Sequence, residues 1–247
     1  MSMEFVNQPV IEFRSVSKSF VQNGKVQPVL RDITGEIERN SIVVFVGPSG
    51  SGKSTLLSLC NMLITSDTGK IIIEGKEVRE WNVNELRRKV GIAFQTAPVI
   101  EGTVQDNLLL TYKMHNQNTY SPEQLTSLTG LSQDLLQHHA RSLSGGQKQK
   151  LSLARTLSNN SSILLLDEIT SALDPISTHE IEELILRLNK EENKTIVWVT
   201  HDLAQAKRVA DWVWLIKNGS IVESASVQDF FLSPQKDITK QFLMGGE

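Results

Sequence analysis

The stretch from Gly47 to Ser54 constrains this chain more than any other segment. It reads Gly-Pro-Ser-Gly-Ser-Gly-Lys-Ser and fits the pattern G-x-x-x-x-G-K-[ST]. A continuous apolar run at residues 41–46 precedes it, and a run with helical spacing at residues 54–63 follows it. The alternative is a flexible Gly/Ser turn, but the flanking patterns favour a loop built between a buried strand and a helix.

Such a loop has the chemistry of an anion cradle. Glycines let successive backbone N–H groups point inward around a phosphate chain, and the following helix adds the positive end of its dipole. Lys53 can bridge the β- and γ-phosphates, and the Ser54 hydroxyl is placed to ligate Mg²⁺. The predicted phosphate-binding residues are Gly47, Pro48, Ser49, Gly50, Ser51, Gly52, Lys53, Ser54 and Thr55.

The rest of the chain predicts an α/β fold. Partly alternating apolar residues at 11–20 and 29–37, broken at Gly24 and Gly35, predict antiparallel strands at the start. Residues 96–160 carry helix-period segments at 104–114, 122–129 and 146–158 and no strong strand, which predicts an inserted helical subdomain. Strand patterns return at 162–166 and 195–200 around a helix at 176–188, as in a mostly parallel sheet. A hairpin at 212–223 and a short helix around 229–244 complete the expected order, after a hairpin at 70–78 and a strand at 89–94 earlier in the chain.

Composition narrows the class of protein. The 247 residues carry 25 Lys+Arg and 28 Asp+Glu, a net charge of −3, with no Lys/Arg-rich block to attract nucleic acid. No apolar stretch approaches the roughly 18–20 residues that cross a bilayer. Residues 1–6 lack the pattern of a secretory signal, and the single cysteine, Cys60, cannot form an internal disulfide. We therefore expect one cytoplasmic domain over residues 1–247 with no nucleic-acid partner.

Two acids follow a second buried strand. Residues 163–166 are Ile-Leu-Leu-Leu, and Asp167 and Glu168 come directly after them. Burying adjacent carboxylates is costly unless a cation or a reactive water accounts for them. We expect Asp167 to hold Mg²⁺, directly or through water, and Glu168 to polarise the water that attacks the γ-phosphate. The alternative is a solvated acidic pair between strand and loop.

Two further polar residues stand at predicted strand ends. His201 follows the strand at 195–200, at the edge where parallel sheets bind ligands, and could contact the γ-phosphate. Gln95 follows the strand at 89–94 and can contact Mg²⁺ or the attacking water. An isolated glutamine carries no signal, so its position relative to the other strand ends is what makes Gln95 a candidate.

A second glycine motif opens a predicted helix. Leu143-Ser144-Gly145-Gly146-Gln147 offers a hydroxyl, bare backbone N–H groups and a helix dipole, with Ser144 as a plausible N-cap. This is a second surface suited to phosphate.

With this motif, the sequence resembles the ATP-binding cassette (ABC) ATPases over nearly the whole chain. The shared motifs, in family order, are the phosphate loop, Gln95, residues 143–147, Asp167-Glu168, residues 171–174 and His201. The resemblance implies a P-loop NTPase core with ATP and Mg²⁺ as ligands. It also implies a homodimer in which two cassettes pair head to tail around two ATP molecules.

The resemblance assigns further residues. Ser144, Gly145 and Gly146, with Gln147 completing the motif, would contact the γ-phosphate of ATP bound by the partner copy, and Asp174 would act across the interface. The aromatic ring that stacks on adenine in this family falls at Phe20, for which the alternative is a plain core residue.

Two departures from the family pattern leave every catalytic group in place. Ile169 stands where proline is usual, and residues 148–150 replace a run that commonly ends in arginine. With Glu168 and His201 both present, the resemblance implies a cassette that hydrolyses ATP. Residues 174–184 are similar to the phosphate-import cassettes, whereas residues 102–108, 167–174 and 197–202 are more similar to the iron-export group, towards which we lean.

The expected function is an ATP hydrolase that drives a separate integral-membrane permease. The protein would then be peripheral on the inner face of the cell membrane and would not touch the transported substrate. A short permease helix is expected to dock between Gln95 and the helical subdomain, over residues 96–101. The alternative is a soluble ATPase of the same superfamily that acts on an iron–sulfur assembly scaffold. A simple P-loop kinase would leave the glycine motif at residues 143–147, the signature motif of the ABC family, unexplained.

Overall fold

The computed structural model describes residues 8–96, 98–110 and 120–245. The described residues divide into two compact units, one formed by residues 8–87 with 195–245 and the other by the described residues between 88 and 194. The expectation that residues 1–6 carry no secretory signal lies outside the described residues, as does the part of the predicted 104–114 helix beyond residue 110. The boundary expected for the helical subdomain, 96–160, stays a prediction.

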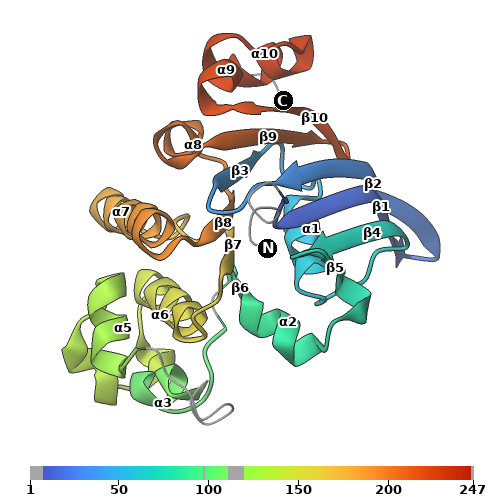
Figure 1. Cartoon of the computed structure of the whole chain (residues 1–247). Helices are drawn as coiled ribbons and strands as arrows, with labels where there is room; N and C mark the ends of the chain where they lie inside the picture. Colours follow the sequence, from blue (N-terminus) through green and yellow to red (C-terminus); the bar gives the residue numbers. More distant parts are fainter. Residues whose placement is uncertain (1–7, 97, 111–119, 246–247) are drawn as a thin grey trace, which may run out of the picture. The chain divides into compact units, whose positions relative to one another are not determined.

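The first unit begins with the antiparallel sheet that the sequence predicts, in the strand order β2-β1-β4-β5 (Figure 1). Asn23 and Gly24 form the turn between the first two strands, both with positive φ (51° and 72°), as a tight hairpin requires. The predicted break at Gly35 is wrong, because Gly35 lies inside the second strand and pairs with Phe13. The strands are β1 (Ile11–Gln22), β2 (Lys25–Ile37), β4 (Thr68–Ile73) and β5 (Lys76–Glu77).

Four more strands of the first unit form a mostly parallel arrangement. The central one, β3 (Ile42–Val46), pairs in parallel with β8 (Thr195–Val199) and with β9 (Trp212–Lys217), and β9 pairs antiparallel with β10 (Ser220–Ser226). Every residue of β3 and β8 is buried, which explains their unbroken apolar sequences. The helical elements of this part of the chain are α1 (Lys53–Cys60), η1 (Val78–Glu80), α2 (Val83–Lys89), α8 (Leu203–Val209), α9 (Val227–Leu232) and α10 (Asp237–Leu243).

The predicted helix at 229–244 is in fact two helices, α9 and α10. Proline at position 234 cannot donate a backbone hydrogen bond and ends the helical run. Glu223 on β10 accepts hydrogen bonds from the backbone N–H groups of Gln235 (2.8 Å) and Lys236 (3.1 Å). Burial opposes ionisation of Glu223, but the Thr239 side chain, these two backbone hydrogen bonds and the charge of Lys236 together outweigh it and lower its pKa. The carboxylate therefore fixes the turn that separates the two helices.

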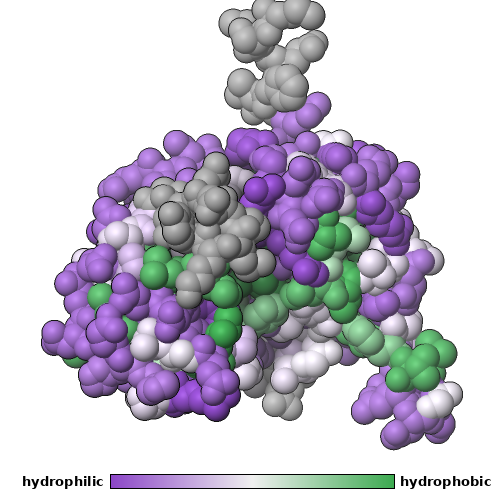
Figure 2. Space-filling model, turned by 90° about the horizontal axis from the view of Figure 1, so that it is seen from below, coloured by the Kyte–Doolittle hydropathy of each residue, from purple (hydrophilic) through white to green (hydrophobic). Residues whose placement is uncertain are grey.

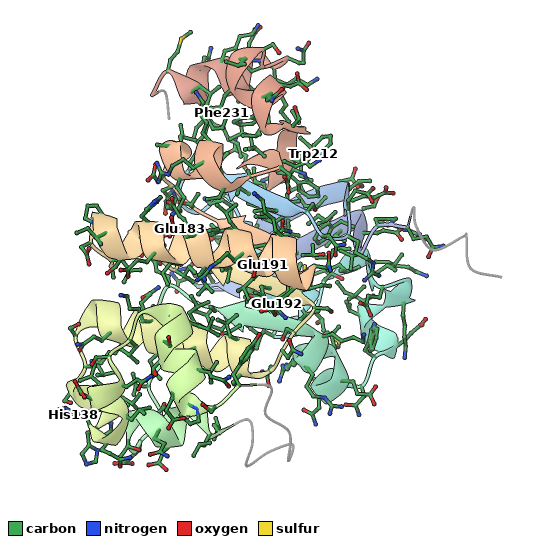
Figure 3. The ribbon with its side chains drawn as sticks, turned by 60° about the vertical axis from the view of Figure 1, so that its left-hand side comes forward. His138, Glu183, Glu191, Glu192, Trp212 and Phe231 are labelled. Carbon is green, nitrogen blue, oxygen red and sulfur yellow. The ribbon has the colours of Figure 1, made fainter. Side chains whose placement is uncertain are left out.

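The second unit contains a parallel strand pair, β6 (Val90–Ala93) with β7 (Ile163–Asp167), and a set of helices. Its helices α3, α5 and α6 all begin with a reciprocal capping box, in which a Ser or Thr hydroxyl accepts a backbone N–H three residues on. Figure 3 shows Glu183, Glu191 and Glu192 along α7, and Glu192 accepts a hydrogen bond from the Tyr120 hydroxyl at 2.8 Å. The helical elements are α3 (Val104–Leu108), α5 (Pro122–Thr129), η2 (Gln133–Gln137), η3 (Ala140–Ser142), α6 (Gly145–Ser158) and α7 (Pro175–Glu192).

An aromatic cluster fills the core of the first unit. The Trp214 ring stacks on Phe45 with centroids 5.1 Å apart and meets Phe13 edge-on at 6.0 Å. A Cβ at Gly35 would lie only 2.8 Å from the Trp214 ring, so glycine is what allows the indole to lie against β2.

We predict that Gly35→Ala destabilises the fold. The added methyl overpacks the fully buried indole, a change that typically costs about 1–3 kcal/mol. Thermal or urea unfolding without nucleotide measures the loss. Gly145→Ala, where a Cβ meets nothing within 4 Å, is the control; equal stability of the two variants would contradict the prediction.

Candidate functional site

Two strand ends of the first unit carry predicted site residues side by side. In the parallel register Phe45 lies opposite Val199, so Gly47 and His201 follow at the same level of the sheet. The Thr200 N–H donates to the Phe45 carbonyl oxygen at 3.3 Å, which continues the pairing past the strand. His201 is exposed at this edge, directly before Asp202, the N-cap of α8. The structure therefore brings the phosphate loop and His201 to one edge.

The phosphate loop begins with a close backbone approach. Gly47 has a φ of 140°, and a Cβ at this position would lie 2.0 Å from the Ile216 carbonyl oxygen of β9. Gly52 also has positive φ (102°), and a Cβ there would lie 2.6 Å from the Leu30 side chain. Both glycines are thus fixed by space as well as by backbone conformation. Gly50, with a φ of 75°, faces open space and is required for conformation alone.

Lys53 is buried within the loop, with 4% of its surface exposed. Its ammonium donates to the carbonyl oxygens of Gly47 and Pro48, each at 2.8 Å, and to the Ser51 hydroxyl at 3.3 Å. A buried ammonium is costly unless it is hydrogen-bonded, and the loop meets that cost with its own oxygens. The result is a positive charge held at the centre of a ring of backbone groups.

The helix that follows is arranged for an anion. Gly52 is its N-cap, and no side chain caps α1. The first N–H groups of a helix have no partner within it, and they carry the positive end of its dipole, so a helix start of this kind suits an anion. The residues present therefore fit a polyphosphate, and the Ser54 hydroxyl at this helix start is an oxygen donor of the kind that Mg²⁺ prefers.

The second unit brings its two strand-end candidates into contact. Ala93 lies opposite Leu166 in the β6–β7 register, so Gln95 and Glu168 follow at the same level. The Gln95 side-chain amide donates to the Glu168 carboxylate at 2.9 Å. Asp167, the last residue of β7, is 8% exposed, which makes it a buried carboxylate at the strand end. The solvated acidic pair is thus not what the structure shows for Asp167.

The backbone at Glu168 is in the left-handed region, with a φ of 51°. Its carbonyl oxygen accepts hydrogen bonds from the Ser171 N–H at 3.1 Å and the Ser171 hydroxyl at 2.9 Å. Holding a non-glycine residue in this backbone conformation costs on the order of 1 kcal/mol of folding free energy. Such strained residues are concentrated at functional positions. The turn after β7 holds the Glu168 side chain in the direction of Gln95.

The signature residues form the start of α6. The Ser144 hydroxyl accepts the Gln147 N–H at 3.3 Å, and the Gln147 side chain accepts the Ser144 N–H at 2.9 Å. A Cβ at Gly146 would lie 3.3 Å from the Leu173 side chain, so the signature packs closely against the segment before Asp174. Gly145 faces open space.

Asp174 is the N-cap of α7. Its carboxylate accepts the backbone N–H groups of Ser177 and Ile176, each at 3.0 Å. Hydrogen bonds from the backbone and side chain of Ser177 lower the pKa of Asp174. The structure thus gives Asp174 a local role in addition to the interface role that the family resemblance implies.

Phe20 lies on β1 and is 40% exposed. It is therefore not the core residue of the alternative interpretation. The Lys18 ammonium lies 5.4 Å from the centroid of its ring. One face of an aromatic ring at the protein surface can stack on a planar base.

Sequence reasoning missed the side chains that hold the loop after Gln95. The Arg155 guanidinium of α6 donates to the Pro98 carbonyl oxygen at 2.5 Å. Asn107 of α3, 1% exposed, accepts the Ile100 N–H at 3.0 Å and donates to the Ile100 carbonyl at 3.0 Å. No sequence signal identifies these residues, because single side chains that bond to loop carbonyls leave no spacing pattern.

The comparisons with known proteins agree with these features. The family model described as ABC transporter matches residues 30–171. The chain belongs to this family. As an ATP-binding cassette ATPase it is the ATP-binding and hydrolysing subunit of an ABC transporter.

The relatives cover nearly the whole chain. The protein YjkB of Bacillus subtilis (strain 168), named as an ABC transporter ATP-binding protein, is 59% identical over 240 residues, 97% of this chain and 96% of that protein. The methionine import ATP-binding protein MetN 2 of Pseudomonas entomophila (strain L48) is 39% identical over 248 residues, 96% of this chain and 73% of that one.

Solved structures confirm the expected α/β cassette fold. The cassette MJ0796, in a dimer described as a post-hydrolysis state bound to ADP and Pi, superposes with a TM-score of 0.82 at 28% identity, over 88% of this chain and 98% of that one. The cbiO1 protein of Clostridium perfringens, described as part of the ABC transporter complex cbiONQ, gives a TM-score of 0.76 at 25% identity, over 95% of both chains.

Among the residues that the structure describes, no helix is long and apolar enough to cross a membrane. Figure 2 shows that hydrophilic residues cover most of the face in view, with smaller hydrophobic areas between them.

We predict that Gly47→Ala disrupts the phosphate loop, whereas Gly50→Ala mainly strains it. The first change forces a methyl into the Ile216 backbone and should cost about 3 kcal/mol or more, the upper end of overpacking. The second meets no atom and should cost about 1–2 kcal/mol for one left-handed residue. Unfolding in urea without nucleotide compares them. A smaller loss for Gly47→Ala than for Gly50→Ala would show that the approach to β9 is not the constraint.

Proposed function

We propose that two copies of this chain close around two ATP molecules and that the closure drives a separate integral-membrane permease. The observation that carries the proposal is that one chain presents two helix N-termini suited to phosphate, at α1 and at α6. The start of α1 holds the buried Lys53 cradle, while the start of α6 presents the exposed Gly145 beside the half-buried Gly146. The dimeric MJ0796 cassette structures support the pairing of two such surfaces.

In this proposal residues 47–55 bind the phosphates of ATP. Lys53 exchanges its contacts with the Gly47 and Pro48 carbonyls for contacts with the β- and γ-phosphates, since a phosphate is the stronger partner of an ammonium. Phe20 stacks on the adenine ring. Because no side chain caps α1, its first N–H groups can bond to phosphate oxygens.

Mg²⁺ fits the oxygen donors that the chain offers. Ser54, Gln95 and Asp167 supply a hydroxyl, an amide and a carboxylate, the ligand types that this hard cation prefers. When bound, the ion would neutralise charge on the β- and γ-phosphates.

Hydrolysis is assigned to Glu168, His201 and Gln95. Glu168 accepts a hydrogen bond from the attacking water and increases its nucleophilicity, while His201 contacts the γ-phosphate. Gln95 binds Glu168 in the structure and holds it in direction. Ser144, Gly145, Gly146 and Gln147 cap the γ-phosphate held by the partner copy, and Asp174 acts across the interface.

The permease is the proposed partner at the membrane. The cbiO1 protein is described as part of a transporter complex, and the MetN relatives are named as import proteins, which supports a membrane-bound assembly for this chain as well. The cassette would then lie on the cytoplasmic face without contact with the cargo. The scaffold ATPase alternative is not favoured by these relatives.

We predict that Glu168→Gln binds Mg·ATP, hydrolyses it at least about 100-fold more slowly and accumulates as a dimer. Binding survives because the phosphate loop is unchanged, while the water is no longer activated. Light scattering with and without ATP, together with phosphate release, measures both effects. Hydrolysis at the normal rate would show that Glu168 is misassigned, and a strictly monomeric protein at saturating ATP would contradict the sandwich.

Lys53→Ala should act on binding itself. Removing the ammonium should weaken ATP affinity by roughly tenfold to 100-fold, the range of a charge-assisted contact. Titration with a fluorescent ATP analogue measures the change, and Lys240→Ala, a lysine on α10 that pairs with Asp237 at 2.9 Å, is the matched control. Unaltered affinity in Lys53→Ala would remove its phosphate role.

A further inference from the structure

Helix α6 has two ends with different surroundings. Its N-terminus carries the signature, Ser144 to Gln147. Near its C-terminus, Arg155 reaches the loop that follows Gln95 and donates to the Pro98 carbonyl oxygen at 2.5 Å. A single rigid helix therefore connects the signature with this loop.

Three side chains fix α6 against the backbone of β6 and its loop. Thr156 donates to the Ile92 carbonyl at 3.1 Å, Gln149 donates to the Phe94 carbonyl at 3.5 Å, and Arg155 donates to Pro98. Thr156 contacts the strand itself and Gln149 contacts the residue directly after it, so both keep the helix in register with β6. Arg155 alone among them reaches past Gln95, to Pro98.

The loop is also held on its other sides. Gln95 at its start binds Glu168 at 2.9 Å, and Ile100 near its end exchanges two hydrogen bonds with Asn107 of α3. The Arg155 contact lies between these two points. Movement of α6 would therefore be transmitted to the middle of the loop while its ends remain attached to the catalytic carboxylate and to α3.

The chemistry of the contact suits a mechanical link. A guanidinium bonded to a carbonyl is a charge-assisted hydrogen bond, about twice as strong as a neutral one. Arg155 is half-buried, and desolvation lowers its pKa, although a guanidinium stays charged at neutral pH. By contrast, Arg141 reaches the same loop through Glu101 at 3.7 Å with both side chains mostly exposed, a geometry that contributes little.

We propose that Arg155 is a positioning residue that couples the signature end of α6 to the loop after Gln95. When ATP brings the signature against a partner copy, α6 is fixed, and Arg155 fixes the loop in turn. The inference rests on the proposed function, because it takes the ATP sandwich as the event that fixes α6 and this loop as the permease contact.

The Ile100 amide reports on the loop, because its N–H is bonded to Asn107. Its hydrogen exchange is measured in the Glu168→Gln protein with and without ATP, and the ratio of the two rates is the readout. In the Glu168→Gln parent, exchange should be roughly tenfold slower with ATP than without it, as expected when one hydrogen-bonded contact limits local opening. With Arg155→Met the ratio should fall to within about twofold, and Arg155→Lys, which retains a charged donor, should restore part of it.

Arg141→Ala is the matched control and should keep the parent ratio. A purely structural role would speed exchange equally with and without ATP and leave the ratio unchanged, so a full ratio in Arg155→Met overturns the inference. If Arg155→Met does not fold, Arg155→Gln replaces it, because its side chain is shorter than that of arginine. A reduced ratio then supports the inference, and a full ratio overturns it. A parent protein that stays monomeric in ATP, measured by light scattering, overturns the proposed function instead.

Discussion

The phosphate loop lies where it does because Gly47 has no side chain. Where the loop leaves β3, the Gly47 backbone lies directly against the Ile216 carbonyl oxygen of β9. A Cβ at Gly47 would overlap that oxygen, so no other residue fits there. From that starting point the chain turns through Gly50 and Gly52, both with positive φ, and returns to begin α1. The buried Lys53 ammonium then bonds to the carbonyls of residues 47 and 48, so the position of the charge depends on the same close approach.

Parallel strand pairing fixes the positions of three further site residues, His201, Gln95 and Glu168. The register of β3 with β8 puts the phosphate loop level with His201, and the register of β6 with β7 puts Gln95 level with Glu168. Residues that are 73 positions apart in sequence therefore meet in a hydrogen bond. Each unit builds its share of the chemistry at the carboxyl ends of its own strands, as parallel sheets generally do.

Much of this could be predicted from the sequence, because the decisive patterns are local. A buried apolar run before Gly47 and a helical run after Ser54 were enough for the strand, the loop and the helix. The alternation of strand and helix patterns along the chain then predicted the α/β fold, which solved structures confirm. The break predicted at Gly35 was wrong, because this glycine makes room for the Trp214 ring against β2 and does not form a turn. The break between α9 and α10 depends on Glu223, a distant carboxylate, and Arg155 gave no pattern at all.

The capping box at the start of α6 has a consequence for how the signature serine can be used. A hydroxyl has two lone pairs and one proton, and Ser144 uses a lone pair to accept the Gln147 N–H. Its proton is therefore not needed by the helix and can be directed outward to an anionic oxygen. Gln147 fixes the rotamer in advance, so little side-chain entropy is lost when that oxygen arrives. In the proposed ATP sandwich, one oxygen atom would thereby serve the folded chain with a lone pair and an incoming nucleotide with its hydrogen.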